Sequence, residues 1–196
     1  MSANNFEFVN AKYRATMSGA VVTGFLNFKG NINELGVSVG FTNSYNKSRT
    51  LKIGCGSVVW VCDNGMISAD FGITRKHTGA VDNELPLAME ILIDMVLEEH
   101  NRNILQRNEM MSIRLTSQER AEYYGVLLFE LDLISSVQAN ALQEEMKKKD
   151  GAFQGDTLWD AYNKVTEVLK TTHPSKLLTV HLKLHDITKE RFKLTV

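Results

Sequence analysis

Residues 51–78 constrain the fold most, because they combine a strand-like run, a tight turn and a basic end. Apart from Trp60, the run 53–61 consists of small and β-branched residues, a composition that suits a pleated, largely buried strand. The turn 63–65, Asp-Asn-Gly, tolerates positive φ, and a second extended run covers residues 66–74. This stretch therefore predicts a β-hairpin that ends in the basic cluster 75–77.

Three further strands are expected before this hairpin, over residues 6–15, 20–28 and 35–41. In the third, Leu35 to Phe41, bulky residues alternate with Gly and Ser, which is the period of a half-buried strand. The connections, including the polar turn 43–49, are too short for crossover helices. We therefore expect residues 1–80 to be mainly strands, with residues 6–76 forming an antiparallel meander.

The pattern becomes helical over residues 84–172. Thr116 and Glu119 have the spacing of a capping box, and Pro86 suits the first turn of a helix. The expected helices are 87–111, 117–134, 137–148 and 158–170. Six of their side chains are expected to bury against the sheet: Leu92, Met95, Val96, Leu127, Leu128 and Leu131.

The last segment, residues 176–196, returns to an alternating pattern. Apolar residues at every second position from Leu178 to Leu184 are typical of a strand, and residues 192–196 leave open a C-terminal hairpin. On such a strand His181 and His185 would share one face, and we expect both at the surface. The sequence as a whole predicts a single α+β domain over residues 1–196, an N-terminal sheet packed by C-terminal helices.

The amino-acid composition indicates the general class of protein to which the chain belongs. The chain has 196 residues, 43% of them hydrophobic and 23% charged, with a net charge of -1. These values are typical of a folded globular protein and give no global basic signature. Two cysteines fit a reducing compartment, and no signal peptide or membrane-length apolar run is seen. We expect a cytoplasmic protein without membrane contact.

The sequence contains little that indicates a metal site or a catalytic site. Cys55 and Cys62 are seven positions apart, so on a regular strand they point to opposite faces and share neither a metal nor a disulfide. No zinc, phosphate-loop or nucleophile motif occurs. We therefore expect no catalytic residue, metal or cofactor, although Asp63 and Asp70 leave a metal-dependent nuclease open.

Cationic residues cluster in the polar turn 43–49 and in the basic segment 75–77. If both lie on one side of the sheet, they could form a nucleic-acid-binding surface. Otherwise they are solvated loops of ordinary surface charge. Clustered cations attract phosphate regardless of base sequence, and aromatic rings stack on bases. The predicted binding residues are Tyr45, Lys47, Arg49, Lys52, Trp60, Arg75, Lys76 and His77.

Three stretches together carry a resemblance: residues 40–48, residues 61–64 followed by 75–78, and residues 157–167, Thr-Leu-Trp-Asp-Ala-Tyr-Asn-Lys-Val-Thr-Glu. Their order and spacing, over roughly residues 20–170, resemble the phage/plasmid-like proteins of domain-of-unknown-function family 932. The resemblance implies a bacterial virus or mobile element as the source and a host bacterial cytoplasm as the location. It brings no assigned chemistry.

The functional expectation is a non-catalytic, nucleic-acid-associated protein that binds or anneals single strands in virus replication or recombination. The link to annealing proteins rests on fold analogy alone. An interaction protein that inhibits a host defence complex is the alternative, with the nuclease third. The partner, single-stranded nucleic acid or a host or phage protein, stays open, as does homo-oligomerisation.

Overall fold

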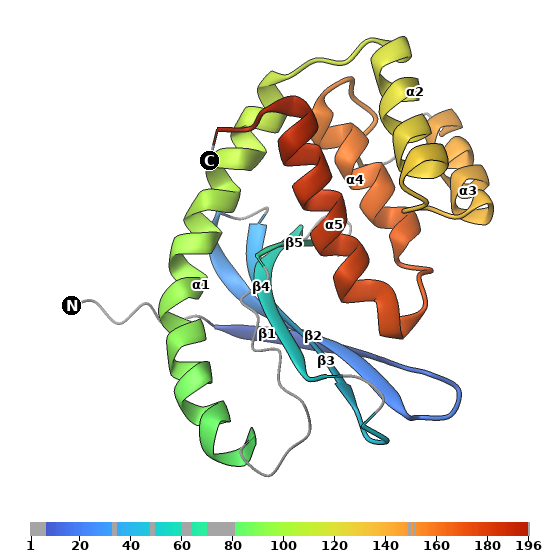
Figure 1. Cartoon of the computed structure of the whole chain (residues 1–196). Helices are drawn as coiled ribbons and strands as arrows, with labels where there is room; N and C mark the ends of the chain where they lie inside the picture. The colour runs from blue at the N-terminus through green and yellow to red at the C-terminus, as the bar shows by residue number, and fades with distance from the viewer. Residues whose placement is uncertain are drawn as a thin grey trace.

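The computed structural model describes residues 7–32, 35–47, 50–59, 64–69, 81–148, 150 and 152–195. Its N-terminal part is a five-stranded antiparallel sheet in the order β1-β2-β3-β4-β5, so the predicted meander is confirmed (Figure 1). The strands are β1 (Phe8–Ala15), β2 (Val21–Ile32), β3 (Leu35–Ser44), β4 (Lys52–Val59) and β5 (Asn64–Ala69).

The first helix, α1 (Val81–Ser112), is 32 residues long and runs along the sheet and on beside the other helices (Figure 1). Val96 packs on a cluster formed by Val37, Ile53 and Cys55. In the strand register Val39 lies opposite Cys55, so these residues share one side of the pleat. This side is named the α1 face.

The last helix, α5 (Pro174–Phe192), packs on the other side of the sheet. Thr23 donates a hydrogen bond to the Pro174 carbonyl (Oγ1–O 2.5 Å), and Leu178 lies over Gly40. Thr23 is paired with Thr42, and the side chains of both lie on the side of the sheet opposite to the α1 face. This side is named the α5 face.

The remaining helices stack beside the sheet and complete the core (Figure 1). They are α2 (Ser117–Gly125), the π-helix η1 (Val126–Glu130), α3 (Ser136–Lys147) and α4 (Leu158–Leu169). Helix α4 lies at the centre, since Leu158, Tyr162 and Val165 are fully buried. The α+β class and its order, sheet first and helices second, are confirmed.

The predicted C-terminal hairpin is wrong, because residues 174–192 form α5. Leu177, Leu178, His181, Leu184 and His185 are buried, a set spaced for one helical face. Pro174 occupies the first turn, and no turn residue interrupts the segment. The segment therefore follows the 3.6-residue helical period and not the two-residue period of a strand. His181 and His185 are buried, so their predicted exposure is wrong.

Helix boundaries and burial differ from expectation at three further places. Helix α1 begins at Val81, which puts Pro86 in its second turn. The expected helix 117–134 ends its regular part at Gly125 and continues as η1. Leu131 follows this bulge and is exposed, so its predicted burial is wrong.

Of the other side chains expected against the sheet, Val96 is confirmed. Met95 is half-buried, and the Leu92 side chain lies outside the described residues. Leu127 and Leu128 pack in the helical core instead.

Candidate nucleic-acid interface

Two turns meet at one end of the sheet. The register places Val21 opposite Ser44, and the Tyr45 amide donates to the Ala20 carbonyl (2.9 Å) across the strands. The β1–β2 and β3–β4 turns therefore lie side by side and project away from the helices (Figure 1). This end, residues 14–23 with residues 42–47 and 50–52, is named the hairpin tip.

The hairpin tip presents an aromatic ring beside cations. Tyr45 is 95% exposed, and Lys47 occupies the same turn at φ 59°. Lys52 begins β4 and lies opposite Thr42. An exposed ring and two lysines at the same end of the sheet have the chemistry to stack on a base and to neutralise its phosphates.

A row of side chains crosses four strands at this end. Arg14, Thr23, Thr42 and Lys52 are successive register partners, so all four lie on the α5 face. The threonine hydroxyls bond each other (2.9 Å) beneath the first turn of α5. The two cations therefore flank the positive end of the α5 dipole, which adds to the positive potential.

The described residues of the strands that form the hairpin tip carry no carboxylate between 8 and 59. Glu7, just before β1, lies beside Lys29 (3.6 Å). The sequence already holds this signal, since residues 8–62 contain Lys12, Arg14, Lys29, Lys47, Arg49 and Lys52 against the single acid Glu34. The net charge of -1 for the whole chain conceals this local excess.

Three of the predicted binding residues lie at the hairpin tip. The structure brings together Tyr45, Lys47 and Lys52, and it adds Arg14, which sequence reasoning missed. The other predicted binding residues lie outside the described residues: Arg49, Trp60, Arg75, Lys76 and His77.

Cys55 is a free cysteine on the α1 face of the sheet. This side chain is buried, and burial, followed by the charge of Glu99, raises the pKa of its thiol to about 12. The thiol therefore stays protonated and unreactive. Cys62, Asp63 and Asp70 lie outside the described residues. Within the described part of the chain, no three His, Cys, Asp or Glu side chains are placed to hold a metal.

A buried polar group joins α1 to the sheet and was not anticipated. Ser57 lies within hydrogen-bond distance of His100 (Oγ–Nδ1 3.2 Å), and Asn103 donates to the same hydroxyl (3.2 Å). All three side chains are fully buried, and burial lowers the pKa of His100. A serine–histidine pair without access for a substrate acts here as a packing contact, not as a nucleophile.

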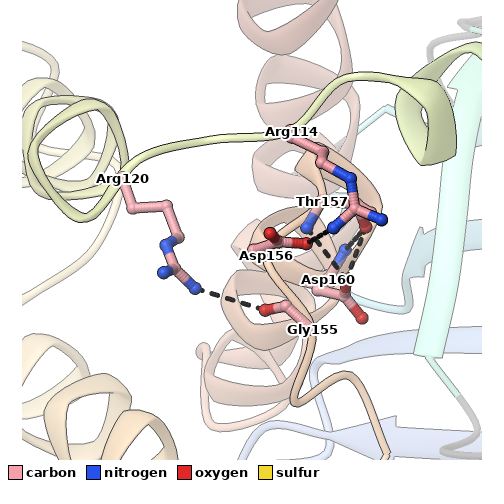
Figure 2. Close-up of polar contacts among 6 residues, drawn as sticks. All are labelled: Arg114, Arg120, Gly155, Asp156, Thr157 and Asp160. Carbon is pink, nitrogen blue, oxygen red and sulfur yellow. Dashed lines mark hydrogen bonds and ion pairs between the residues drawn. The ribbon is translucent and has the colours of Figure 1, made fainter.

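The segment 155–160, which overlaps the start of the third resemblance stretch, is held by polar contacts to Arg114, between α1 and α2, and to Arg120 of α2 (Figure 2). Arg114 pairs with Asp156, and this hydrogen bond holds the carboxyl pKa below its usual value. Arg120 donates to the Gly155 carbonyl (3.2 Å). Thr157 and Asp160 close a capping box at the start of α4. These contacts fix the central helix, so this stretch serves the fold.

The chain is an α+β protein in which an antiparallel meander lies between α1 and α5 and a cationic hairpin tip stands at one end of the sheet. The family model described as a domain of unknown function, DUF932, matches residues 29–190. The chain therefore belongs to that family, as its three sequence stretches predict. No curated protein and no solved structure matches it. Among the described helices, none has the length and hydrophobicity needed to cross a membrane.

Proposed function

We propose that the protein binds single-stranded nucleic acid at the hairpin tip, as a non-catalytic phage or mobile-element protein acting in replication or recombination. The observation that carries the proposal is the exposed Tyr45 ring beside Lys47 and Lys52 on a surface whose described charges are all positive. Unpaired bases offer open faces to such a ring, whereas bases in a duplex are stacked on each other.

A protein–protein role is the second candidate, and a separate observation favours it. Phe129 and Val137 are 83% and 78% exposed, close in sequence at the corner between η1 and α3. Val137 also lines an open cavity of about 480 Å³ between α3 and the start of α5. Large exposed apolar side chains are typical of docking surfaces, and an inhibitor of a host defence complex would use this corner.

Charge reversal at the hairpin tip tests the first proposal. In the Lys47→Glu/Lys52→Glu variant we expect weaker binding of a labelled single-stranded oligonucleotide. The slope of log affinity against log salt should flatten by about 0.7 for each phosphate that the variant no longer neutralises. Thermal stability should change little, because Lys47 is exposed, Lys52 is half-buried, and charges near the surface contribute little to folding. Fluorescence anisotropy across a salt series measures the slope.

The matched control is Lys147→Glu/Lys183→Glu, which changes the net charge equally through exposed lysines of α3 and α5. Its slope should equal that of the wild-type protein. Equal slopes for both variants would refute binding at the hairpin tip. The second candidate would be favoured if Phe129→Ser abolished binding to a protein partner and left binding to the oligonucleotide unchanged.

A further inference from the structure

Strand β1 is an edge of the sheet. Its inner side pairs with β2 from Phe8 to Ala15, and no other described strand pairs with its outer side. The Thr16 amide donates to the Val21 carbonyl (3.0 Å), so by alternation Arg14 and Lys12 turn their backbone groups inward. Ala11 and Tyr13 therefore turn theirs outward, which is a template for a further strand.

A bulge at Val9 sets the side-chain order along this edge. Phe8 is paired with Phe28 while Asn10 is paired with Asn27, so Val9 is the extra residue. Glu7 then lies on the α5 face, where it contacts Lys29. Phe8 lies on the α1 face with Phe28, at 5.8 Å between ring centroids.

With this order, β1 is complementary to itself. We propose that β1 pairs antiparallel with β1 of a second copy of this chain, about a two-fold axis at Ala11. Counting past the bulge, Glu7 of each copy lies opposite Arg14 of the other, on the α5 face. Phe8 lies opposite Tyr13 on the α1 face, where both rings are more than half exposed in the single chain. Asn10 lies opposite Lys12.

Two neighbouring registers that keep the outward backbone groups aligned place like charges together. An axis at Lys12 puts this lysine opposite its own copy, and an axis at Tyr13 puts Lys12 opposite Arg14. Like charges directly opposite on neighbouring strands are destabilising, whereas opposite charges and aromatic pairs stabilise. The axis at Ala11 gives two Glu7–Arg14 pairs and two aromatic pairs by symmetry. An axis at Asn10 would place Glu7 opposite Lys12 but Phe8 opposite Ala11, so it lacks the aromatic pairs. Charge and ring positions together therefore favour a second copy paired about Ala11.

This pairing does not depend on nucleic-acid binding. It uses β1, and although Arg14 belongs to both surfaces, Tyr45 and Lys47 lie in the turn between β3 and β4 and not on the joined edge. The two proposals are therefore separated by measuring association without nucleic acid. A monomer that binds single strands would overturn the pairing alone, and a dimer that binds none would overturn the proposed function alone.

Charge exchange tests the pairing in the full chain. Sedimentation equilibrium over a concentration series should show a monomer–dimer equilibrium for the wild-type protein. Arg14→Glu should weaken it about tenfold or more, because two attractive contacts become repulsive. Glu7→Arg/Arg14→Glu should restore it, since the charges are then exchanged. A wild-type monomer at all concentrations, or a double variant as weak as Arg14→Glu, would overturn the proposal.

Cysteine cross-linking tests the register independently. Ala11→Cys should form a disulfide-linked dimer under mild oxidation, because the two Ala11 Cα atoms lie about 5.5 Å apart in a hydrogen-bonded antiparallel pair. Ala15→Cys is the matched control, as it lies on the same face of β1 and is more exposed. Equal cross-linking of both variants would contradict the axis at Ala11, and so would the absence of cross-linking at Ala11.

Discussion

Trp159→Ala is expected to lower the free energy of unfolding by about 3–5 kcal/mol. The indole is buried at the start of α4, where it stacks on Tyr162 with the rings 10° from parallel. Phe153 approaches its edge, and the Arg107 guanidinium lies over its ring at 5.9 Å. Truncation leaves a cavity bounded by α1 and the loop before α4. Urea denaturation measures the decrease in stability.

The control for this prediction is Phe129→Ala, also an aromatic-to-alanine truncation, but of a side chain that is 83% exposed. Its effect should stay within about 0.5 kcal/mol. Because a domain of this kind is stable by only about 5–15 kcal/mol, loss of Trp159 should unfold a visible fraction at moderate temperature. A change below about 1 kcal/mol at Trp159 would contradict the central place given to α4.

Acidification from pH 7 to pH 5 is expected to lower the free energy of unfolding by about 2 kcal/mol through His185. Burial, followed by the charge of Lys189, lowers the pKa of this histidine from 6.5 to about 4. The packed neighbour on α4 is the Tyr162 ring, which lies edge-on at 6.3 Å and offers no charge. The folded state therefore keeps His185 neutral.

The sign follows from the depressed folded-state pKa. Between pH 6.5 and 4 the unfolded chain binds a proton that the folded chain does not, so stability is complete above pH 6.5 and falls as pH decreases towards 4. Burial lowers the pKa of His100 as well, which acts in the same direction. In His185→Gln the decrease in stability between pH 7 and pH 5 should shrink by about 2 kcal/mol. Unfolding curves that show equal pH dependence for both proteins would contradict this account.

The sheet was predictable because its signals are local. Alternation over Leu35–Phe41 and the short polar turns determine strands and antiparallel order without reference to distant residues. The C-terminal segment was not predictable in the same way, since residues 177–185 satisfy both a two-residue and a helical period. The helix is stabilised by the packing of Leu178 on Gly40 and by the Thr23–Pro174 hydrogen bond. Both contacts join residues that are far apart in sequence.

The candidate site was predictable from residue type but not from position. Tyr45, Lys47 and Lys52 follow from an exposed polar turn with cations beside it. Arg14 joins them because strand pairing aligns it with Lys52 in one row across β2 and β3. Composition does not reveal this alignment. The buried Ser57–His100 contact likewise depends on where α1 crosses β4.

Equilibrium binding of a labelled oligothymidine strand at low salt tests nucleic-acid binding at the hairpin tip most directly, with wild-type, Tyr45→Ala and Tyr45→Phe proteins compared. We expect measurable wild-type affinity and a decrease of about 1–3 kcal/mol in Tyr45→Ala, because one base no longer stacks on the ring. Tyr45→Phe keeps the ring and should bind nearly as the wild type does. A wild-type protein without affinity, or a Tyr45→Ala protein that binds equally well, would contradict the account.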